Sequence, residues 1–189
     1  MAGDERIRLF CALQLPGSAV DGLAAWQARH LPAGARGLRV VETGHLHLTL
    51  AFLGSRPVAE LPHIADELGQ AARAAGPVRL RAEHYRETRS VGMIVFSDLG
   101  GAATALASDL GERLERIGAY RREQRPWLPH VTVARFRERP GLEPPPPDLG
   151  EVSPSDAAVY SSVLRPTGAR YDVLEKRALS SSNRMTGGR

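Results

Sequence analysis

Residues 44–54 read GHLHLTLAFLG, and residues 129–136 read PHVTVARF. The tetrads HLTL, from His47, and HVTV, from His130, follow one pattern: histidine, apolar residue, threonine, apolar residue. Alternation of polar and apolar residues is typical of a β-strand that buries one face. The two stretches therefore predict two strands of the same design, 83 residues apart in the chain (130 − 47). The rest of the sequence must form a fold that accommodates both.

Further strands and helices are predicted around these two stretches from the spacing of apolar residues. The expected strands are residues 6–15, 38–41, 78–85, 93–96, 157–164 and 170–175; the expected helices cover about 18–29, 61–72 and 102–117. Strands and helices are interleaved, some strands form hairpin-like pairs, and no glycine-rich phosphate loop is present. This order favours an α+β fold with antiparallel sheets over a doubly wound parallel sheet.

Composition indicates a globular protein of ordinary hydrophobicity, with 189 residues, 42% hydrophobic residues and a net charge of +4. No stretch is apolar enough for a membrane span or a signal peptide, so we expect a cytoplasmic protein. The single cysteine, Cys11, allows no intrachain disulfide, and its apolar surroundings predict a buried thiol. We expect one domain over residues 1–180, a disordered tail over 181–189, and a monomer.

The charge is carried mostly by arginine, since Lys176 is the only lysine. Arginine binds phosphate through two parallel hydrogen bonds, which favours an anionic partner. A chain rich in arginine, alanine and glycine is also typical of a GC-rich genome. Composition alone therefore leaves the nature of the partner open.

The two histidine motifs predict a specific chemistry. Alternate residues of a strand point the same way, so His47 shares a face with Thr49, and His130 with Thr132. If the two strands are neighbours, two imidazoles and two hydroxyls line one cleft. A neutral imidazole can accept a proton while an imidazolium donates one, and hydroxyls can hydrogen-bond phosphate oxygens. This set of groups suits phosphoryl transfer without a metal ion.

Two further residues lie beside the motifs. Arg135 follows Thr132 by three positions, so strict alternation places it on the opposite face, and a bulge or twist is needed to bring it to the phosphate. His45 shares the face of His47, but the second motif has Leu128 at the equivalent position. The comparison selects His47 for catalysis and places His45 at the mouth of the strand, near a ligand.

Three alternatives concern the surroundings of the motifs. The pair His45 and His47 has the spacing of two metal ligands, but no acidic residue or cysteine lies near in sequence, so neither a metal nor another cofactor is predicted. Phe52 and Trp127 are candidates to stack on a base, or to pack in the core or at the rim. His45, Phe52 and Trp127 therefore remain candidate rim or base contacts.

At these residues the chain resembles the two-histidine phosphoesterase superfamily, which is defined by paired His-x-Thr-x motifs. Within it, the chain is most similar to the LigT-like RNA 2′,3′-cyclic phosphodiesterases, also called 2′-5′ RNA ligases. RLFCALQLP at residues 8–16 resembles the opening strand of this family, and YSSVLRPTGARYDVL at 160–174 resembles its closing hairpin. The resemblance implies a bilobal fold: two antiparallel sheets related by a pseudo-twofold axis, helices outside and a central cleft.

The resemblance also implies an activity and a role for each motif residue. The activity is hydrolysis of a 2′,3′-cyclic phosphate, on an RNA end or a small cyclic nucleotide, to a 2′-phosphomonoester. His47 matches the proton donor, which protonates the leaving 3′ oxygen, and His130 matches the proton acceptor, which activates water. Thr49 and Thr132 match the threonines that hold the phosphate. Arg135 matches the arginine that follows the family's second motif.

Two other functions are compatible with the same residues. Formation of a 2′-5′ RNA linkage is the same chemistry in reverse, and an RNA-binding module would use the arginine-rich cleft without turnover. Pure binding does not need two titrating groups, which argues against the second. Replacing His47 and His130 by alanine separates the classes, because a binder keeps its RNA affinity while an enzyme loses rate by orders of magnitude.

Overall fold

The computed structural model describes residues 5–32, 34, 37–165 and 168–180. The predicted tail at 181–189 and residues 166–167 of the predicted final turn lie outside this range. Strands and helices alternate as the sequence predicts, and the expected α+β class is confirmed. The elements, with η for 3₁₀-helices, are β1 (Arg6–Gln14), α1 (Gly17–His30), β2 (Leu38–Val40), η1 (Thr43–His45), β3 (His47–Pro57), η2 (Val58–Glu60), α2 (Leu61–Ala74), β4 (Leu80–Glu87), β5 (Val91–Asp98), α3 (Ala102–Arg116), β6 (His130–Phe136), β7 (Glu151–Val152), β8 (Asp156–Arg165) and β9 (Gly168–Ala178).

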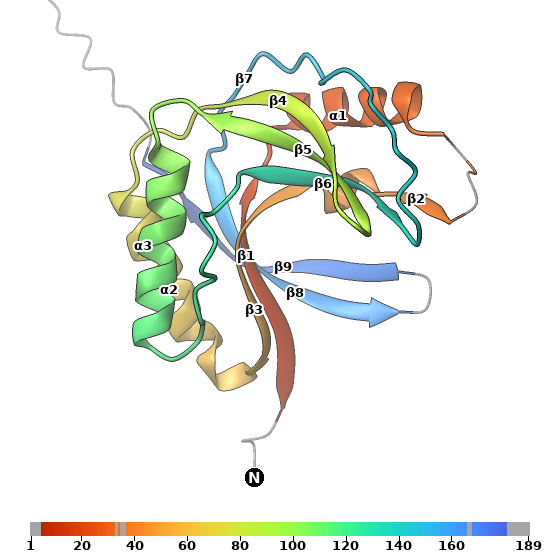
Figure 1. Ribbon diagram of the computed structural model, residues 1–189. Helices are drawn as coiled ribbons and strands as arrows, with labels where there is room; N and C mark the ends of the chain where they lie inside the picture. The colour runs from red at the N-terminus through yellow and green to blue at the C-terminus, as the bar shows by residue number, and fades with distance from the viewer. Residues whose placement is uncertain (1–4, 33, 35–36, 166–167, 181–189) are drawn as a thin grey trace, which may run out of the picture.

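The strands of the described chain form one curled antiparallel sheet (Figure 1). Its order is β7-β4-β5-β6-β3-β1-β8-β9, with β2 added to β6. The resemblance implies two antiparallel sheets; in the structure these are two halves of one sheet, joined where β3 meets β6. At this junction the only pair in register is Leu48 with Val131. Each is the residue between the histidine and the threonine of its motif, so the junction brings the two motifs together.

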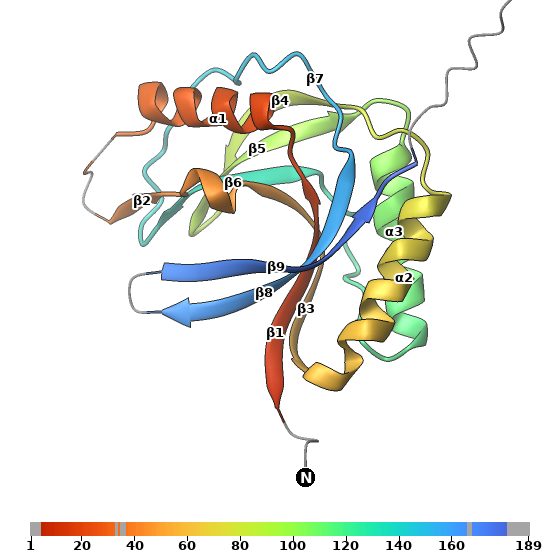
Figure 2. The same ribbon diagram turned by 180° about the vertical axis from the view of Figure 1, so that it is seen from behind.

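The helices lie outside the sheet, as expected. α2 and α3 lie side by side along one edge of the molecule, and α1 lies at the opposite end, above β6 and β2 (Figures 1 and 2). Ile64, Leu68 and Leu110, three of the apolar residues at helical spacing, are buried. They pack with Leu48 and Val131, so the apolar face of each motif strand is fixed in the core. No helix of the described residues is long and apolar enough to cross a membrane.

The single cysteine is buried in β1, as the sequence predicts. Loss of hydration raises the pKa of the Cys11 thiol to about 12, because burial disfavours the thiolate. A thiol that stays protonated at neutral pH is a poor nucleophile. Cys11 therefore serves as a small apolar core residue.

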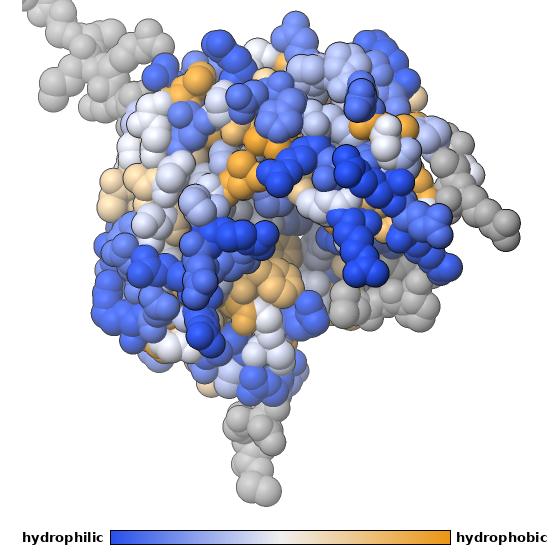
Figure 3. Space-filling view, viewed as in Figure 1, coloured by the Kyte–Doolittle hydropathy of each residue, from blue (hydrophilic) through white to orange (hydrophobic). Residues whose placement is uncertain are grey.

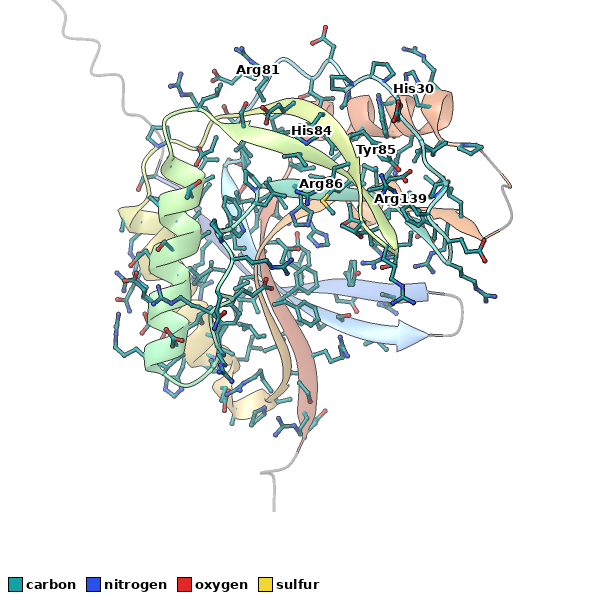
Figure 4. All side chains as sticks on the ribbon, viewed as in Figure 1. His30, Arg81, His84, Tyr85, Arg86 and Arg139 are labelled. Atoms are coloured by element: carbon teal, nitrogen blue, oxygen red, sulfur yellow. The ribbon has the colours of Figure 1, made fainter. Side chains whose placement is uncertain are left out.

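The proline-rich connection between β6 and β7 is held to the sheet by one buried carboxylate. Glu87, at the end of β4, accepts hydrogen bonds from the Tyr85 hydroxyl (3.0 Å), Arg139 Nε (3.1 Å), and the backbone N–H groups of Gly141 and Leu142 (3.0 Å each). Figure 4 shows Tyr85 and Arg139 near each other below α1. The first residues of the connection are therefore attached to β4.

The same connection is also attached to α1. Trp26 Nε1 donates a hydrogen bond to the carbonyl oxygen of Pro145 at 2.7 Å. A Cβ atom added at Gly22 would come within 2.6 Å of the end of the Leu149 side chain, so the connection lies in close contact with the helix at this point. The proline run at residues 144–147 is consistent with either a stiff surface connection or a local linker, and in the structure the connection is packed over the protein.

We expect Glu87→Gln to lower the free energy of unfolding by about 2 kcal/mol at pH 7, because four donors lose a charged, buried acceptor. Burial would raise the pKa of Glu87, but the four hydrogen bonds hold it below its ordinary value. Its stabilisation is therefore present at neutral pH and is lost as the pH falls through this lowered pKa. Urea unfolding at pH 7 and at pH 3 should show a large difference from wild type at pH 7 and a small one at pH 3.

Glu83→Gln is the matched control, since Glu83 lies on the same strand with an exposed side chain. It should change stability by no more than about 0.5 kcal/mol. Equal stability of Glu87→Gln and Glu83→Gln at pH 7 would contradict the role of the buried carboxylate.

Candidate active site

A cavity of about 420 Å³ lies over the junction of β3 and β6. It is lined by His47 and Thr49 from β3 and by His130 and Thr132 from β6. The space-filling view shows a hollow near the middle of this face, with hydrophilic residues around much of its rim (Figure 3). The structure thus brings all four predicted motif residues into one cavity, which we call the histidine cleft.

Each histidine is the first residue of its strand, and its ring is held by the residue two positions before it. His130 Nδ1 lies 2.8 Å from the carbonyl oxygen of Leu128. A carbonyl can only accept, so Nδ1 carries the hydrogen, and Nε2 of the neutral ring is left as the proton acceptor. The ring of His47 makes the corresponding hydrogen bond with the backbone of His45. The two imidazoles therefore have matching supports.

A β-bulge in β6 turns Arg135 into the cleft. Thr132 pairs with Met93 and Ala134 pairs with Gly92, so Val133 is an extra residue between them. Val133 and Ala134 are both buried, and Arg135 is exposed and lines the cavity. If the same residues formed a strand without a bulge, strict alternation would place Arg135 on the core side.

The same bulge occurs in β3. Thr49 pairs with Ala12 and Ala51 pairs with Cys11, which leaves Leu50 as the extra residue. The bulge turns Phe52 into the cleft, where its side chain is 50% exposed. Phe52 in β3 thus occupies the position that Arg135 occupies in β6. The two motif strands have the same backbone design and differ in this last side chain, one aromatic and the other cationic.

The two histidines have different neighbours across the sheet. The ring of His47 is surrounded by an aromatic box formed by Phe10 (4.8 Å between ring centroids), Tyr171 (5.5 Å) and Tyr160 (5.8 Å). These residues come from β1, β9 and β8. The β5 residue paired with His130 is Val95, which is aliphatic. The two histidines therefore differ in the side chains that surround them.

The aromatic box changes the acidity of His47. Burial is the main cause that lowers the pKa of this imidazole to about 4, since a charged ring loses hydration among aromatic side chains. The hydrogen bond with the backbone of His45 opposes this shift, and the positive charges of His45, His130 and Arg135 add to it. In the ligand-free protein, His47 is therefore neutral at neutral pH.

The comparisons with known proteins agree with this geometry. The sequence profile described as "LigT like Phosphoesterase" matches residues 13–89. A protein of Thermus thermophilus named RNA 2′,3′-cyclic phosphodiesterase is 34% identical, over 92% of this chain and 90% of its own length. The chain belongs to the LigT-like phosphoesterase family. An Escherichia coli protein of the same name is 28% identical over 92% of this chain and 97% of its own length.

A solved structure shares the fold of this LigT-like chain. The crystal structure of E. coli LigT in apo form matches with a TM-score of 0.80 and 27% identity, covering 94% of this chain and 99% of that one. The similarity includes both halves of the curled sheet, since it extends over nearly the whole chain. The resemblance expected from the paired motifs is therefore confirmed at the level of the family and the fold.

Of the candidate rim residues of this LigT-like site, two line the cleft and one does not. His45 and Phe52 line it, and the ring of His45 lies 4.7 Å from that of Tyr171. Trp127 does not line the cavity; it packs on the core, and its Nε1 donates to the carbonyl oxygen of Thr49 at 3.0 Å. Its position makes it a support of β3, which corresponds to the packing alternative given for Trp127 rather than to a contact with a base.

Several residues of the site were not singled out from the sequence of this LigT-like protein, among them Phe10, Arg39 and Tyr171, which line the cleft, and Tyr160, whose ring lies against His47. Phe10, Tyr160 and Tyr171 belong to strands far from the motifs in sequence, and Arg39 lies on the short β2. The residue pattern within β1 or β8 does not show which strand lies beside it. No local feature of the sequence therefore indicates that Phe10 or Tyr160 is close to His47. Their role depends on the strand order, which the motifs alone do not specify.

The described residues contain no group of three or more histidine, cysteine, aspartate or glutamate side chains placed to hold a metal ion. His45 and His47, the pair with metal-ligand spacing, interact through a backbone hydrogen bond, and His45 contacts Tyr171.

We expect the Cε1–H resonance of His47 to titrate with a midpoint near pH 4 in the ligand-free protein. In Tyr171→Ala the midpoint should rise, because water reaches the ring and stabilises the imidazolium. An NMR titration of both proteins measures the two midpoints. Val163→Ala, which changes an exposed residue of β8, is the control and should leave the midpoint in place. An unshifted midpoint in Tyr171→Ala would show that the aromatic box does not control this acidity.

Proposed function

We propose that this LigT-like phosphoesterase hydrolyses 2′,3′-cyclic phosphates, on RNA ends or small cyclic nucleotides, to 2′-phosphomonoesters. The observation that carries the proposal is the pairing of Leu48 with Val131, which places His47 and His130 on two sides of one cavity. The names of the relatives from T. thermophilus and E. coli support the substrate class.

His130 is the proton acceptor in this proposal. Its Nδ1 hydrogen is held by the carbonyl of Leu128, so the lone pair of Nε2 is available to take a proton from water. The water oxygen forms a bond to phosphorus as that proton leaves. The bond between phosphorus and the 3′ oxygen then breaks, and the phosphate remains on the 2′ oxygen.

His47 is the proton donor, and its acidity makes donation depend on the substrate. The imidazole is neutral in the free protein because its pKa is about 4. A cyclic phosphodiester carries a negative charge, and an opposite charge within about 4–6 Å raises the pKa of a histidine. The bound phosphate thus draws a proton onto His47, which then transfers it to the leaving 3′ oxygen. Water is consumed: its oxygen and one hydrogen remain on the phosphate, and its other proton is on His130. The site resets when His130 releases that proton to solvent and His47 takes up another with the next substrate.

The remaining cleft residues bind the substrate. The hydroxyls of Thr49 and Thr132 hydrogen-bond the non-bridging phosphate oxygens, and the guanidinium of Arg135 offsets their growing charge. Phe52 lies on the half of the cleft with the aromatic box, which suits stacking against a base. His45 borders the same half, so we assign it to the wall of the nucleoside site.

We expect the wild-type protein to convert an oligonucleotide ending in a 2′,3′-cyclic phosphate to the 2′-phosphate product. His47→Ala and His130→Ala should each lower kcat by about 10²–10⁴-fold, because each removes one proton transfer. Chromatography that separates 2′- from 3′-phosphate ends measures the product and the rate together. Val163→Ala is the control on an exposed site and should retain the wild-type rate.

The same experiment distinguishes the other functions. A 3′-phosphate product would reverse the assignment of the leaving oxygen. If the wild type shows no turnover but binds the oligonucleotide, and the double variant of His47 and His130 binds equally well, the protein is a binding module. A ligated product in the presence of a second RNA with a free 5′-hydroxyl end would assign the reverse reaction.

We expect full activity in excess chelator, because the two imidazoles supply both proton transfers. Turnover is measured before and after dialysis against EDTA, and again after addition of Zn²⁺ or Mn²⁺. Activity lost in chelator and restored by either metal would instead assign His45 and His47 as metal ligands.

A further inference from the structure

A buried amide joins helix α1 to the second motif strand, over which the helix lies (Figure 1). Gln27 is on the inner face of α1 and is 4% exposed. Its Nε2 donates two hydrogen bonds, to the carbonyl oxygens of Val41 and Val133, each at 2.9 Å. An amide nitrogen carries two hydrogens, so both are used. Because an unpaired buried amide costs free energy, these bonds explain how a polar residue is accommodated on a helix face whose other buried residues are hydrophobic.

One of the two acceptors, Val133, is the extra residue of the β-bulge in β6. Thr132 and Ala134 pair with consecutive residues of β5, so the ladder to β5 passes over Val133. On the opposite side of β6, the Val133 carbonyl accepts a hydrogen bond from the backbone N–H of Val41 at 3.0 Å and a second one from Gln27. The bulge residue is therefore held from this side by two donors, and one of them is a side chain of α1.

This bulge lies between the two phosphate-binding side chains of β6. Thr132 directly precedes Val133, Arg135 follows it by two positions, and both Thr132 and Arg135 line the histidine cleft. A shift of one residue in a strand turns the following side chains to the other face. Loss of the bulge from the unchanged sequence would thus turn Arg135 away from the cleft. The position of the Val133 backbone determines how the Thr132 hydroxyl and the Arg135 guanidinium lie relative to each other.

The bulge of the first motif strand has a comparable support. An extra residue disrupts the ladder of a strand locally, so donors from outside the sheet can stabilise the backbone there. In β3, Trp127 Nε1 donates to the carbonyl oxygen of Thr49, which directly precedes the extra residue Leu50. Each motif strand therefore receives a side-chain hydrogen bond at its bulge, from Trp127 in one case and from Gln27 in the other.

We propose that Gln27 is a positioning residue of the active site: it holds the carbonyl of Val133, keeps the bulge in place and so directs Arg135 to the reacting phosphate. This inference rests on the proposed function, in which Arg135 offsets the charge of the phosphate oxygens. Gln27 does not line the cavity, so it acts through the backbone of β6. A displacement of about 1 Å in a group that positions the substrate can lower the rate by about 10²-fold.

The test is a double-mutant cycle of Gln27→Met and Arg135→Ala. Methionine is an unbranched side chain that fills the space of glutamine without donating a hydrogen bond. The substrate is an oligonucleotide ending in a 2′,3′-cyclic phosphate. We expect Gln27→Met to lower kcat/KM by about tenfold in the wild-type background and by less than about twofold in the Arg135→Ala background. The second effect is small because no guanidinium is left to misplace.

Trp26→Phe is the matched control. Trp26 is the buried neighbour of Gln27 on α1, and it also donates a side-chain hydrogen bond to a carbonyl, that of Pro145. This carbonyl belongs to the proline-rich connection and not to a motif strand. Trp26→Phe should therefore keep kcat/KM within about twofold of the wild type. Circular dichroism at the assay temperature checks that each variant is folded.

A second variant covers the case in which Gln27→Met does not fold. Gln27→Asn keeps a buried amide but is one methylene shorter, so it cannot reach both carbonyls. It enters the same cycle with Arg135→Ala and should show the same difference between the two backgrounds.

Each outcome decides for or against the positioning role. An equal loss of kcat/KM in both backgrounds would show that Gln27 only stabilises the fold, and no loss in either would show that the site does not need it. A loss in Trp26→Phe as large as that in Gln27→Met would assign the effect to α1 as a whole. Each of these three results overturns the proposal.

A different result separates this inference from the proposed function. If the wild type hydrolyses no 2′,3′-cyclic phosphate, the proposed function fails, and calorimetry with inorganic phosphate tests the positioning role on the same proteins. Binding that weakens about tenfold in Gln27→Met, with no further loss when Gln27→Met is added to Arg135→Ala, supports the role. Unchanged binding in Gln27→Met, or a wild type that binds no phosphate, refutes it.

Discussion

One backbone pair connects the two halves of the sheet, and the site depends on it. Leu48 and Val131 are buried, so the hydrophobic effect fixes each strand with its polar face outward. Because each lies between a histidine and a threonine, the pairing that completes the sheet also places both motifs in one cavity. Folding and assembly of the site are consequently one event, with the core holding the geometry that the cleft uses.

The near symmetry of the motif strands makes the source of chemical asymmetry easy to locate. Both strands begin with a histidine supported by the residue two positions earlier, and both contain a bulge at the same place. Two imidazoles in identical surroundings would have the same pKa, so neither would differ from the other in its tendency to give or take a proton. Of the two motif histidines, only His47 is surrounded by Phe10, Tyr160 and Tyr171, so the chemical difference between the two imidazoles arises from neighbouring strands that carry no motif.

The sequence predicts the elements and the motif residues well, because both depend on local patterns. Apolar alternation gives the strands, helical spacing gives buried residues such as Leu68 and Leu110, and the repeated tetrad identifies His47 and His130. The aromatic box and Arg39 could not be found in this way. Their importance comes from strand order, and a pattern within one strand contains no information on which strand lies beside it.

The bulges at Leu50 and Val133 each change which alternate residues of the strand face the cleft. In β3 the side chains that face the cleft are His47 and Thr49 before the extra residue and Phe52 after it. In β6 they are His130 and Thr132 before the extra residue and Arg135 after it. One strand can therefore give the cleft a His-x-Thr pair and a third side chain five positions from the histidine, without losing its buried face. Deleting one residue at either bulge would restore simple alternation and keep Phe52 opposite Phe10, or Arg135 opposite Val91, on the cleft face, so each bulge adds a buried side chain without moving the one that faces the cleft.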